Sequence, residues 1–214
     1  MNARIETGSS QSAYNRRYGQ VWLFFMYYWL IFGISVYFGQ FLPAAWRQPM
    51  SVGLGLLVLV TMVVQRARFS GPIISHIYTI VAGLLSYATF MYSLADLGAQ
   101  TFLMIVLLAI TGFVAFGVLG FFVIRDASSM GKYLFVTLIA LICMSIVAWI
   151  FHIPMLYTVI SVVGLLLFLL YTLYDFNRLK RGAFAPREMG FNLFLNLFRI
   201  IRHALNLAQT MRRQ

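Results

Sequence analysis

Six runs of apolar residues, each near the length of a bilayer-crossing helix, dominate this chain. They cover residues 21–42, 50–64, 72–94, 101–124, 133–151 and 155–174. A bilayer core about 30 Å thick needs roughly 20 apolar residues in helical form, and only the run at 50–64 is clearly shorter. Backbone amides in lipid must be bonded within their own segment, and the runs lack the alternation of barrel strands. The sequence therefore predicts an all-α integral membrane protein with a bundle of six transmembrane helices.

The composition excludes an ordinary water-soluble domain. Hydrophobic residues make up 62% of the 214 residues and charged residues only 10%, against about a quarter charged in soluble domains. The length fits one domain. We expect a polar cytoplasmic N-terminal tail over residues 1–20 and a single multi-span membrane domain over 21–214. The tail is too long for the charged start of a signal peptide, so we expect the first span to stay in the protein.

The basic residues predict an orientation. With six spans the connectors alternate sides, and every one of the 16 Lys and Arg residues except Arg47 then falls on one side. The positive-inside rule places that side, with both termini, in the cytoplasm of a plasma membrane, for a bacterial chain the inner membrane. Because the basic residues sit between apolar runs, we expect the lipid bilayer as their partner and no nucleic acid.

The C-terminal segment, about 188–207, has a different pattern. Polar residues recur every three or four positions and form one stripe on a helix whose other faces are apolar, at Glu188, Asn192, Asn196, Arg199, Arg202, His203 and Asn206. The interrupting arginines favour an amphipathic helix at the membrane interface or a re-entrant one. The alternative is a seventh helix inside the bundle, with its asparagines turned toward the centre.

Several short motifs together resemble the Bax-inhibitor (transmembrane Bax inhibitor motif) family in its bacterial type. "RDASSMGKYLF" resembles the family's connector after the fourth helix, with Asp126, Ser128 and Gly131 at matching places. "YTLYDFNRLK" is similar to the end of its sixth helix, with Tyr174 and Asp175 matching. "GPIISHIYTIVAGL" resembles its third helix and "FNLFLNLFRI" its last. The order and spacing of the motifs cover most of the chain from residue 71 onward.

The resemblance implies six helices around a central C-terminal seventh. It also implies one of two functions known in bacterial relatives, a pH-sensitive calcium leak or an association with a membrane-bound ATP-dependent protease. In the leak members two aspartates share a proton, and Asp175 matches the first. Met189 stands where the second is expected, and Glu188 is one residue away, about 100° around the helix. The connector motif of Asp126, Ser128 and Gly131 is expected to be structural.

Asp175 is also the most informative residue without the family. A carboxylate near hydrocarbon costs a few kcal/mol, and at a helix C-terminus it faces the negative end of the macrodipole. It can be a residue that reaches water beside Arg178, or a gate that pairs with Arg66, Arg68 or Arg178. If Glu188 lies close, the two carboxylates would titrate as a pair and offer weak oxygen ligands to calcium.

Three function classes follow. The first, which we favour, is a pH-sensitive cation leak, with calcium and protons as its partners and protonation of Asp175 as its gate. The alternative is a non-conducting regulator that binds another membrane protein, such as an ATP-dependent membrane protease. The third, an enzyme, is not expected, because the sequence has no serine–histidine pair, metal-ligand cluster or phosphate loop. We expect no cofactor beyond weakly bound calcium.

Overall fold

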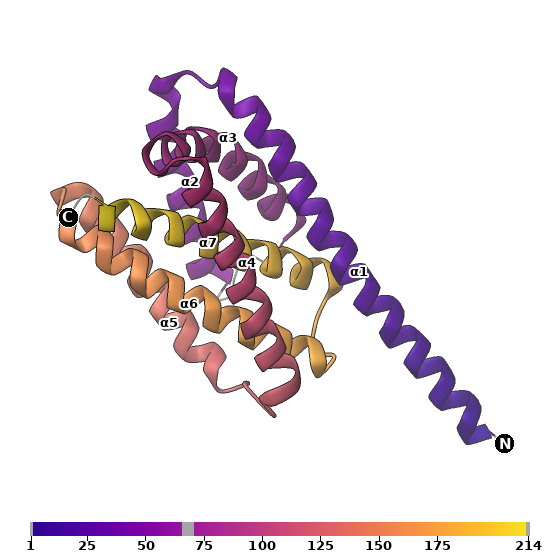
Figure 1. Cartoon of the computed structure of the whole chain (residues 1–214). Helices are drawn as coiled ribbons and strands as arrows, with labels where there is room; N and C mark the ends of the chain where they lie inside the picture. The colour runs from indigo at the N-terminus through magenta and orange to yellow at the C-terminus, as the bar shows by residue number, and fades with distance from the viewer. Residues whose placement is uncertain (1, 66–70, 213–214) are drawn as a thin grey trace.

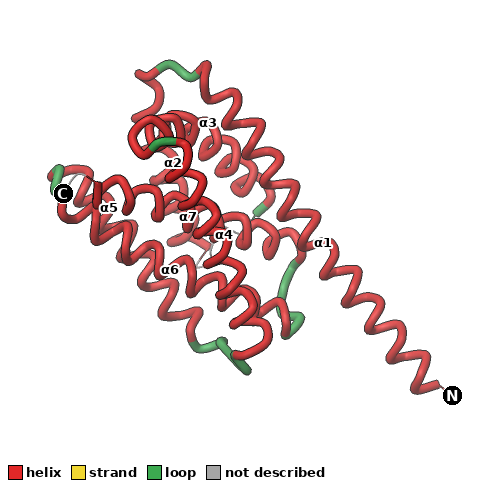
Figure 2. The backbone as a smooth tube through the Cα atoms, viewed as in Figure 1, coloured by secondary structure: helices red, strands yellow, loops and turns green. Residues whose placement is uncertain are grey.

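The fold is built from helices joined by short connections (Figures 1 and 2). The computed structural model describes residues 2–65 and 71–212. No strand occurs among them, which confirms the all-α class. The elements in chain order are α1 (Asn2–Phe38), the 3-10 turn η1 (Gly39–Phe41), α2 (Ala44–Gln65), α3 (Pro72–Leu97), α4 (Ala99–Val118), the π-helical turn η2 (Leu119–Val123), α5 (Met130–Phe151), α6 (Pro154–Lys180) and α7 (Pro186–Arg212).

Five helices among the described residues are long and apolar enough to cross a membrane. The five candidates, found among the described residues, are Asn15–Phe41, Pro72–Leu97, Ala99–Val123, Met130–Phe151 and Met155–Lys180. Helix α2 contains the predicted span at 50–64 and leads from the end of α1 to the start of α3. Its first turns carry Arg47, Gln48 and an internal proline, Pro49, so the helix is longer but more polar than the apolar run alone.

The N-terminal region, predicted as a polar cytoplasmic tail over residues 1–20, is helical from Asn2 onward. Helix α1 begins at Asn2 and continues without a break into the first span. In Figure 1 its N-terminal part projects beyond the other helices. Residues 1–20 contain no proline, and their two glycines are Gly8 and Gly19. A single glycine does not by itself end a helix, so the helix can continue into the span.

Proline and glycine set several helix ends. Pro72 and Pro154 stand at the first turns of α3 and α6, where a missing backbone N–H costs nothing. Gly98 closes α3 with φ of 81°, a conformation that favours glycine, and its N–H bonds to the carbonyl of Leu94. The tight turn between α3 and α4 therefore follows directly from one residue.

Helix α7 lies in the middle of the bundle. It packs against α1, α3, α4 and α6, and Figure 1 shows it crossing behind α4 and between the other helices. Every residue from Met189 to Phe198 is buried. The interfacial helix that the sequence favoured is thus wrong, and the alternative of a seventh helix inside the bundle is right.

Close packing around α7 depends on a small residue. A Cβ added at Gly190 would come within 2.6 Å of Phe24 Cβ and 2.7 Å of the Val21 carbonyl oxygen on α1. Real Cβ atoms do not approach so closely, so the two helices can touch here only through glycine. This contact fixes the first turns of α7 against the first span.

The path of α7 runs from one end of the bundle to the other. Near its start, the Arg17 side chain of α1 donates a hydrogen bond to the Phe184 carbonyl. In its last turns, Gln209 Nε2 donates to Ser93 Oγ near the end of α3, at 3.0 Å. The last described turn therefore lies at the end opposite the start of the first span. This differs from the prediction that both termini share a side, which assumed that the last segment does not cross.

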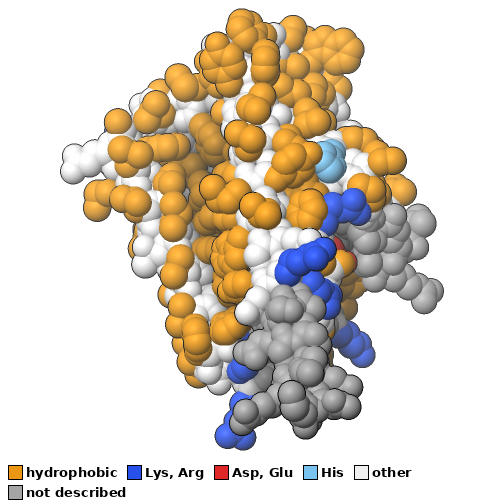
Figure 3. Space-filling model, turned by 90° about the vertical axis from the view of Figure 1, so that its right-hand side faces the viewer, with side chains coloured by type: hydrophobic (Ala, Val, Ile, Leu, Met, Phe, Trp, Pro, Cys, Tyr) orange, Lys and Arg blue, Asp and Glu red, His pale blue; other side chains and the backbone are white. Residues whose placement is uncertain are grey.

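The surface fits a bilayer environment. Figure 3 shows hydrophobic side chains over most of one face, with Lys and Arg gathered in its lower part. Many large apolar side chains are exposed along the spans, among them Leu23, Leu108 and Phe122 at 70% or more of their surface. In water such a surface would be unstable, so lipid contact is what the helices require.

Candidate functional site

The candidate site is built around Asp175, in the last two turns of α6. The helix does not end where its apolar run ends at residue 174. It continues to Lys180, so Asp175 is an internal helical residue and its side chain can turn inward. The residue is only 1% exposed, although a carboxylate is costly to bury. The reading in which Asp175 reaches water therefore does not hold.

The central helix provides a partner for this buried carboxylate. Asn196 Nδ2 donates a hydrogen bond to Asp175 Oδ2 at 2.8 Å, and both residues are buried. On the other side, Arg178 Nη1 lies 3.9 Å from Asp175 Oδ1, one helical turn further along α6. Two donors of different kinds, an amide and a guanidinium, thus face one carboxylate. The pair of Asp175 and Asn196 ties α6 to α7 in the core.

Glu188 lies near Asp175 only through a shared arginine. Arg178 Nη2 is 3.8 Å from Glu188 Oε1, so the guanidinium is within ion-pair distance of both carboxylates. The Glu188 side chain is 37% exposed. Met189, at the position where the resemblance expects an aspartate, is 1% exposed and points into the apolar core. The one-residue offset seen in the sequence thus places the acid at the rim and the methionine inside.

Of the three predicted gating partners, the structure places one. Arg178 is the predicted gating partner that lies beside Asp175. Arg66 and Arg68 lie outside the described residues. Arg178 is itself held over the ring of Tyr174, with its Cζ atom 5.8 Å from the ring centroid. Its guanidinium is therefore positioned by an aromatic ring as well as by the two acids.

A second cluster holds the connector after η2 to the end of α6. Asn177 is fully buried and makes three hydrogen bonds, one to η2 and two to the connector that follows it. Its Nδ2 donates to the carbonyls of Gly120 at 3.1 Å and Ile124 at 2.8 Å, and its Oδ1 accepts from the Ala127 N–H at 2.9 Å. One side chain thus satisfies backbone groups that the end of a helix leaves without partners.

Asp126 and Ser128 shape the same connector. Asp126 Oδ1 accepts a hydrogen bond from the Ser128 backbone N–H at 2.8 Å and also from the Ser128 hydroxyl. These bonds, with the nearby Arg181, lower the pKa of the Asp126 carboxyl. The ion-pair partner is Arg181, at 3.0 Å. The residue therefore closes a turn between helices and pairs with the end of α6.

Gly131 completes the connector motif. A Cβ added there would lie 2.6 Å from the hydroxyl oxygen of Tyr174. The first turn of α5 therefore packs directly on the tyrosine that precedes Asp175. All three predicted motif residues, Asp126, Ser128 and Gly131, lie around the end of α6.

The arrangement of a buried aspartate on the sixth helix, a motif connector clasped to it and a central last helix can be compared with known proteins. The sequence model of the family described as "Inhibitor of apoptosis-promoting Bax1" matches residues 14–213. The chain belongs to this Bax inhibitor-like family of membrane proteins. The resemblance predicted from the motifs is thereby confirmed, and its match extends back through the first span.

Two site residues of this Bax inhibitor-like protein were not singled out from its sequence. Asn177 follows Asp175 by two residues, and its three bonds reach residues 50 to 57 positions away. Asn196 was noted only as part of the polar stripe. A buried asparagine in an apolar helix is itself a signal, because its amide needs partners inside the protein.

No ready-made metal cage stands at the site. Among the described residues, no group of three or more His, Cys, Asp or Glu side chains comes together. The two predicted calcium ligands, Asp175 and Glu188, both lie beside the Arg178 guanidinium. A positive charge thus already occupies the region near both acids.

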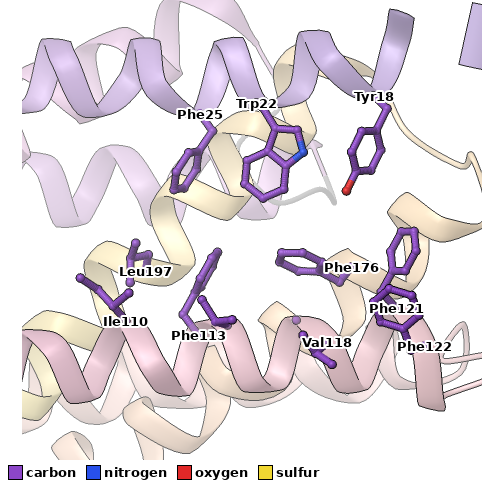
Figure 4. A pocket seen from close by; sticks show the side chains of 12 residues that line it. Tyr18, Trp22, Phe25, Ile110, Phe113, Val118, Phe121, Phe122, Phe176 and Leu197 are labelled. Atoms are coloured by element: carbon purple, nitrogen blue, oxygen red, sulfur yellow. The ribbon is translucent and has the colours of Figure 1, made fainter. Parts of the chain in front are cut away.

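The Bax inhibitor-like bundle also has an aromatic pocket between α1 and α4, of about 390 Å³. Figure 4 shows Tyr18, Trp22 and Phe25 of α1 pointing toward Phe176 and Phe113 across the gap. The described lining residues carry no charge. An apolar pocket of this kind suits a hydrocarbon group and gives no path for an ion.

Proposed function

We propose that this protein is a pH-sensitive cation leak, with calcium as its cargo and Asp175 as its gate. The observation that carries the proposal is the burial of Asp175 at 1% exposure, with Asn196 of the central helix as hydrogen-bond donor. A carboxylate inside a membrane bundle is expensive and is typical of ion and proton pathways. Helix termination and packing do not require it.

The gate would work by charge. Ionised Asp175 accepts the Asn196 hydrogen bond and attracts Arg178, so it holds α6 and α7 together. A proton on Asp175 removes the charge and weakens both attractions, because charge-assisted hydrogen bonds are about twice as strong as neutral ones. The helices are then free to separate at this point. Protonation would thus shift the balance between a closed and a conducting arrangement.

Calcium fits this proposal as a passing ion. Tight calcium sites use six to eight oxygen ligands, and the described carboxylates at the gate are two, both beside an arginine. A leak needs sites that an ion can leave quickly. If Arg178 moves away, Asp175 and Glu188 would offer such weak, transient ligands.

We also propose a bacterial inner-membrane location with the N-terminus in the cytoplasm. The support is the charge distribution. The start of the first span, the connector after η2 and the end of α6 carry most of the basic residues, and α7 begins at that same end of the bundle. The positive-inside rule puts this end in the cytoplasm. The last described turn of α7 would then face the other side.

Calcium flux into dye-loaded proteoliposomes, measured across pH, tests the leak directly. Asp175→Asn keeps the size of the side chain and removes its charge, so we expect flux that no longer depends on pH. Glu188→Gln is the matched control, because it removes the rim carboxylate and leaves the buried one. It should keep a pH-dependent flux, with only a modest shift.

Absence of flux above empty liposomes, from protein shown to be folded, would exclude a leak. A pH dependence that survives in Asp175→Asn would show that another group is the sensor. A pH dependence lost in Glu188→Gln and kept in Asp175→Asn would reverse the roles of the two acids.

One observation favours the regulator as the second candidate. The buried position that should hold a second acid holds Met189, and Glu188 stays at the rim with Arg178. The resemblance implies two acids that share a proton, whereas the described core holds one acid, Asp175. Reconstitution with a membrane-bound ATP-dependent protease, with proteolysis rate as the readout, tests this role. An unchanged rate at saturating amounts of this protein would reject it.

A further inference from the structure

The bundle has a second, larger cavity. It is separated by the central helix α7 from the aromatic pocket between α1 and α4. It has a volume of about 730 Å³ and is bounded by α2, α3, α5, α6 and α7. Much of its wall is apolar. Four side chains that carry or can carry positive charge line it, namely Arg47, Arg199, Arg202 and His203, and none of its described lining residues is acidic.

Among the described residues, His203 has no hydrogen-bond partner in this cavity. The residue is 8% exposed, and neither ring nitrogen has a hydrogen-bond partner. Its ring stacks on Phe168 with centroids 5.8 Å apart and an interplanar angle of 21°. Behind the ring, a Cβ at Gly164 would collide with it. The imidazole is thus fixed in place, with two buried polar atoms unsatisfied, and such atoms are rare in native proteins.

Arg199 is in a similar position. It lies over the ring of Tyr78, with Cζ 5.6 Å from the centroid, and its buried Nε has no hydrogen-bond partner. No ion pair between described residues involves Arg199 or Arg202. Arg47 makes one long bond, to the Leu42 carbonyl at 3.4 Å. A cavity inside a membrane bundle therefore carries an excess of positive charge with no protein counterion among the described residues.

Such charge needs a negative partner, because an uncompensated cation within a bilayer bundle is costly. Guanidinium groups bind phosphate and carboxylate oxygens through paired, charge-assisted hydrogen bonds. The volume also falls within the range of about 300–1,000 Å³ for small-molecule sites. We propose that this cavity is a binding site for an oxyanion, of the phosphate or carboxylate type, held by its basic lining residues Arg47, Arg199, Arg202 and His203.

The site is separate from the gate but mechanically linked to it. On α7, Arg199 follows Asn196 by one turn, and Asn196 holds Asp175. An anion bound at Arg199 would bring negative charge within a turn of that contact. The cavity also disfavours cations while it is empty, since its arginines repel them. Occupancy would therefore neutralise one wall of the bundle.

Two sources could supply this chemistry. An acidic phospholipid would place its phosphate at the arginines and an acyl chain along the apolar wall, between residues such as Leu138, Leu141 and Ile160. A free inorganic anion would occupy the basic part alone. Both would be recognised by the same side chains, so the probes must separate them.

The test uses the full-length protein in detergent and measures its thermal unfolding midpoint together with bound lipid by native mass spectrometry. Phosphatidylglycerol is titrated against phosphatidylcholine, and sodium phosphate against chloride at equal ionic strength. We compare wild type with Arg202→Gln, and use Arg212→Gln, an exposed arginine in the last turn of α7, as the control. Arg47→Gln is a second cavity variant in case Arg202→Gln does not fold.

We expect phosphatidylglycerol, and not phosphatidylcholine, to bind and to raise the unfolding midpoint of wild type and Arg212→Gln. The apparent affinity should fall about tenfold in Arg202→Gln or Arg47→Gln, the usual cost of one charge-assisted hydrogen bond. The same pattern with phosphate alone would identify a free anion as the source. Equal affinity in cavity and control variants, or no response to either anion, would overturn the proposal.

Discussion

Asn196 of the central helix donates a hydrogen bond of 2.8 Å to Asp175 of α6, and both side chains are buried. This bond joins the two helices at Asp175, the acid that is buried in the described part of the core. It gives the carboxylate a polar partner that the flanking apolar residues cannot supply. The stability of the α6–α7 contact and the state of the candidate gate are therefore linked.

Replacing Asn196 by Leu should destabilise the protein by about 1.5–3 kcal/mol, the cost of losing a hydrogen bond to a charged group. Thermal unfolding in detergent measures this. Asn192→Leu is the matched control, one turn earlier on α7 and equally buried. Its Oδ1 has no partner, so we expect a much smaller loss. Equal losses in the two variants would show that the Asn196 bond contributes nothing specific.

Gly190→Ala should be destabilising by about 1–3 kcal/mol, because the new methyl group meets backbone and Cβ atoms of α1 that cannot move aside easily. Gly33→Ala is the control, since a Cβ at Gly33 has nothing within 4 Å. That variant should be neutral or slightly stabilising, as alanine favours helix. A tolerated Gly190→Ala, measured by thermal unfolding, would mean that α1 and α7 are less tightly packed than described.

Asn177→Ala should loosen the connector after η2. The substitution leaves the Ala127 N–H and two carbonyls without their bonds, at a cost of at least about 2 kcal/mol. Limited proteolysis should then cut the 124–129 segment faster than in wild type. Lys132 is an exposed residue just beyond this segment, and in the control variant Lys132→Ala the protease should cut the segment at the wild-type rate. Equal rates in the two variants would contradict the role given to Asn177.

The lowered pKa of Asp126 predicts how the stability of the folded protein should change with pH. Hydrogen bonds from Ser128 lower its pKa in the folded protein, so ionised Asp126 favours folding. This contribution is complete above the unfolded aspartate pKa of about 3.9 and is lost as pH falls through the lower folded pKa. The stability difference between wild type and Asp126→Asn should therefore be constant near neutral pH and shrink below about pH 4. A stability difference between the two proteins that stays constant down to pH 2 would contradict a stabilising role for ionised Asp126.

Local sequence patterns could predict the helices because their causes are local. The apolar runs required helices, and Pro72, Gly98 and Pro154 mark ends that the structure reproduces. Asp175 could be selected for the same reason, since one acid in an apolar segment stands out. Helix α2 contains the apolar run at 50–64 and begins before it, so the flanking Arg47 and Pro49 belong to the same helix.

The path of the last helix could not be predicted in this way. A stripe of asparagines and arginines satisfies its polar groups equally well at a lipid headgroup or inside a bundle. The choice depends on partners far away in the sequence, Asp175 for Asn196 and Tyr78 for Arg199. For the same reason, the sequence did not indicate that the last described turn of α7 lies at the opposite end of the bundle from the start of the first span.

The sequence by itself therefore determined the class of the protein, its family and the residue at the centre of its candidate site, because each depends on hydrophobicity or on motifs within a few residues. The tertiary structure decided which groups face Asp175, that Glu188 stays at the rim while Met189 enters the core, and that three basic residues of α7 line one cavity. Those facts follow from the rotation and depth of one helix among its neighbours. Packing contacts such as Gly190 on α1 fix them, and no local pattern records such contacts.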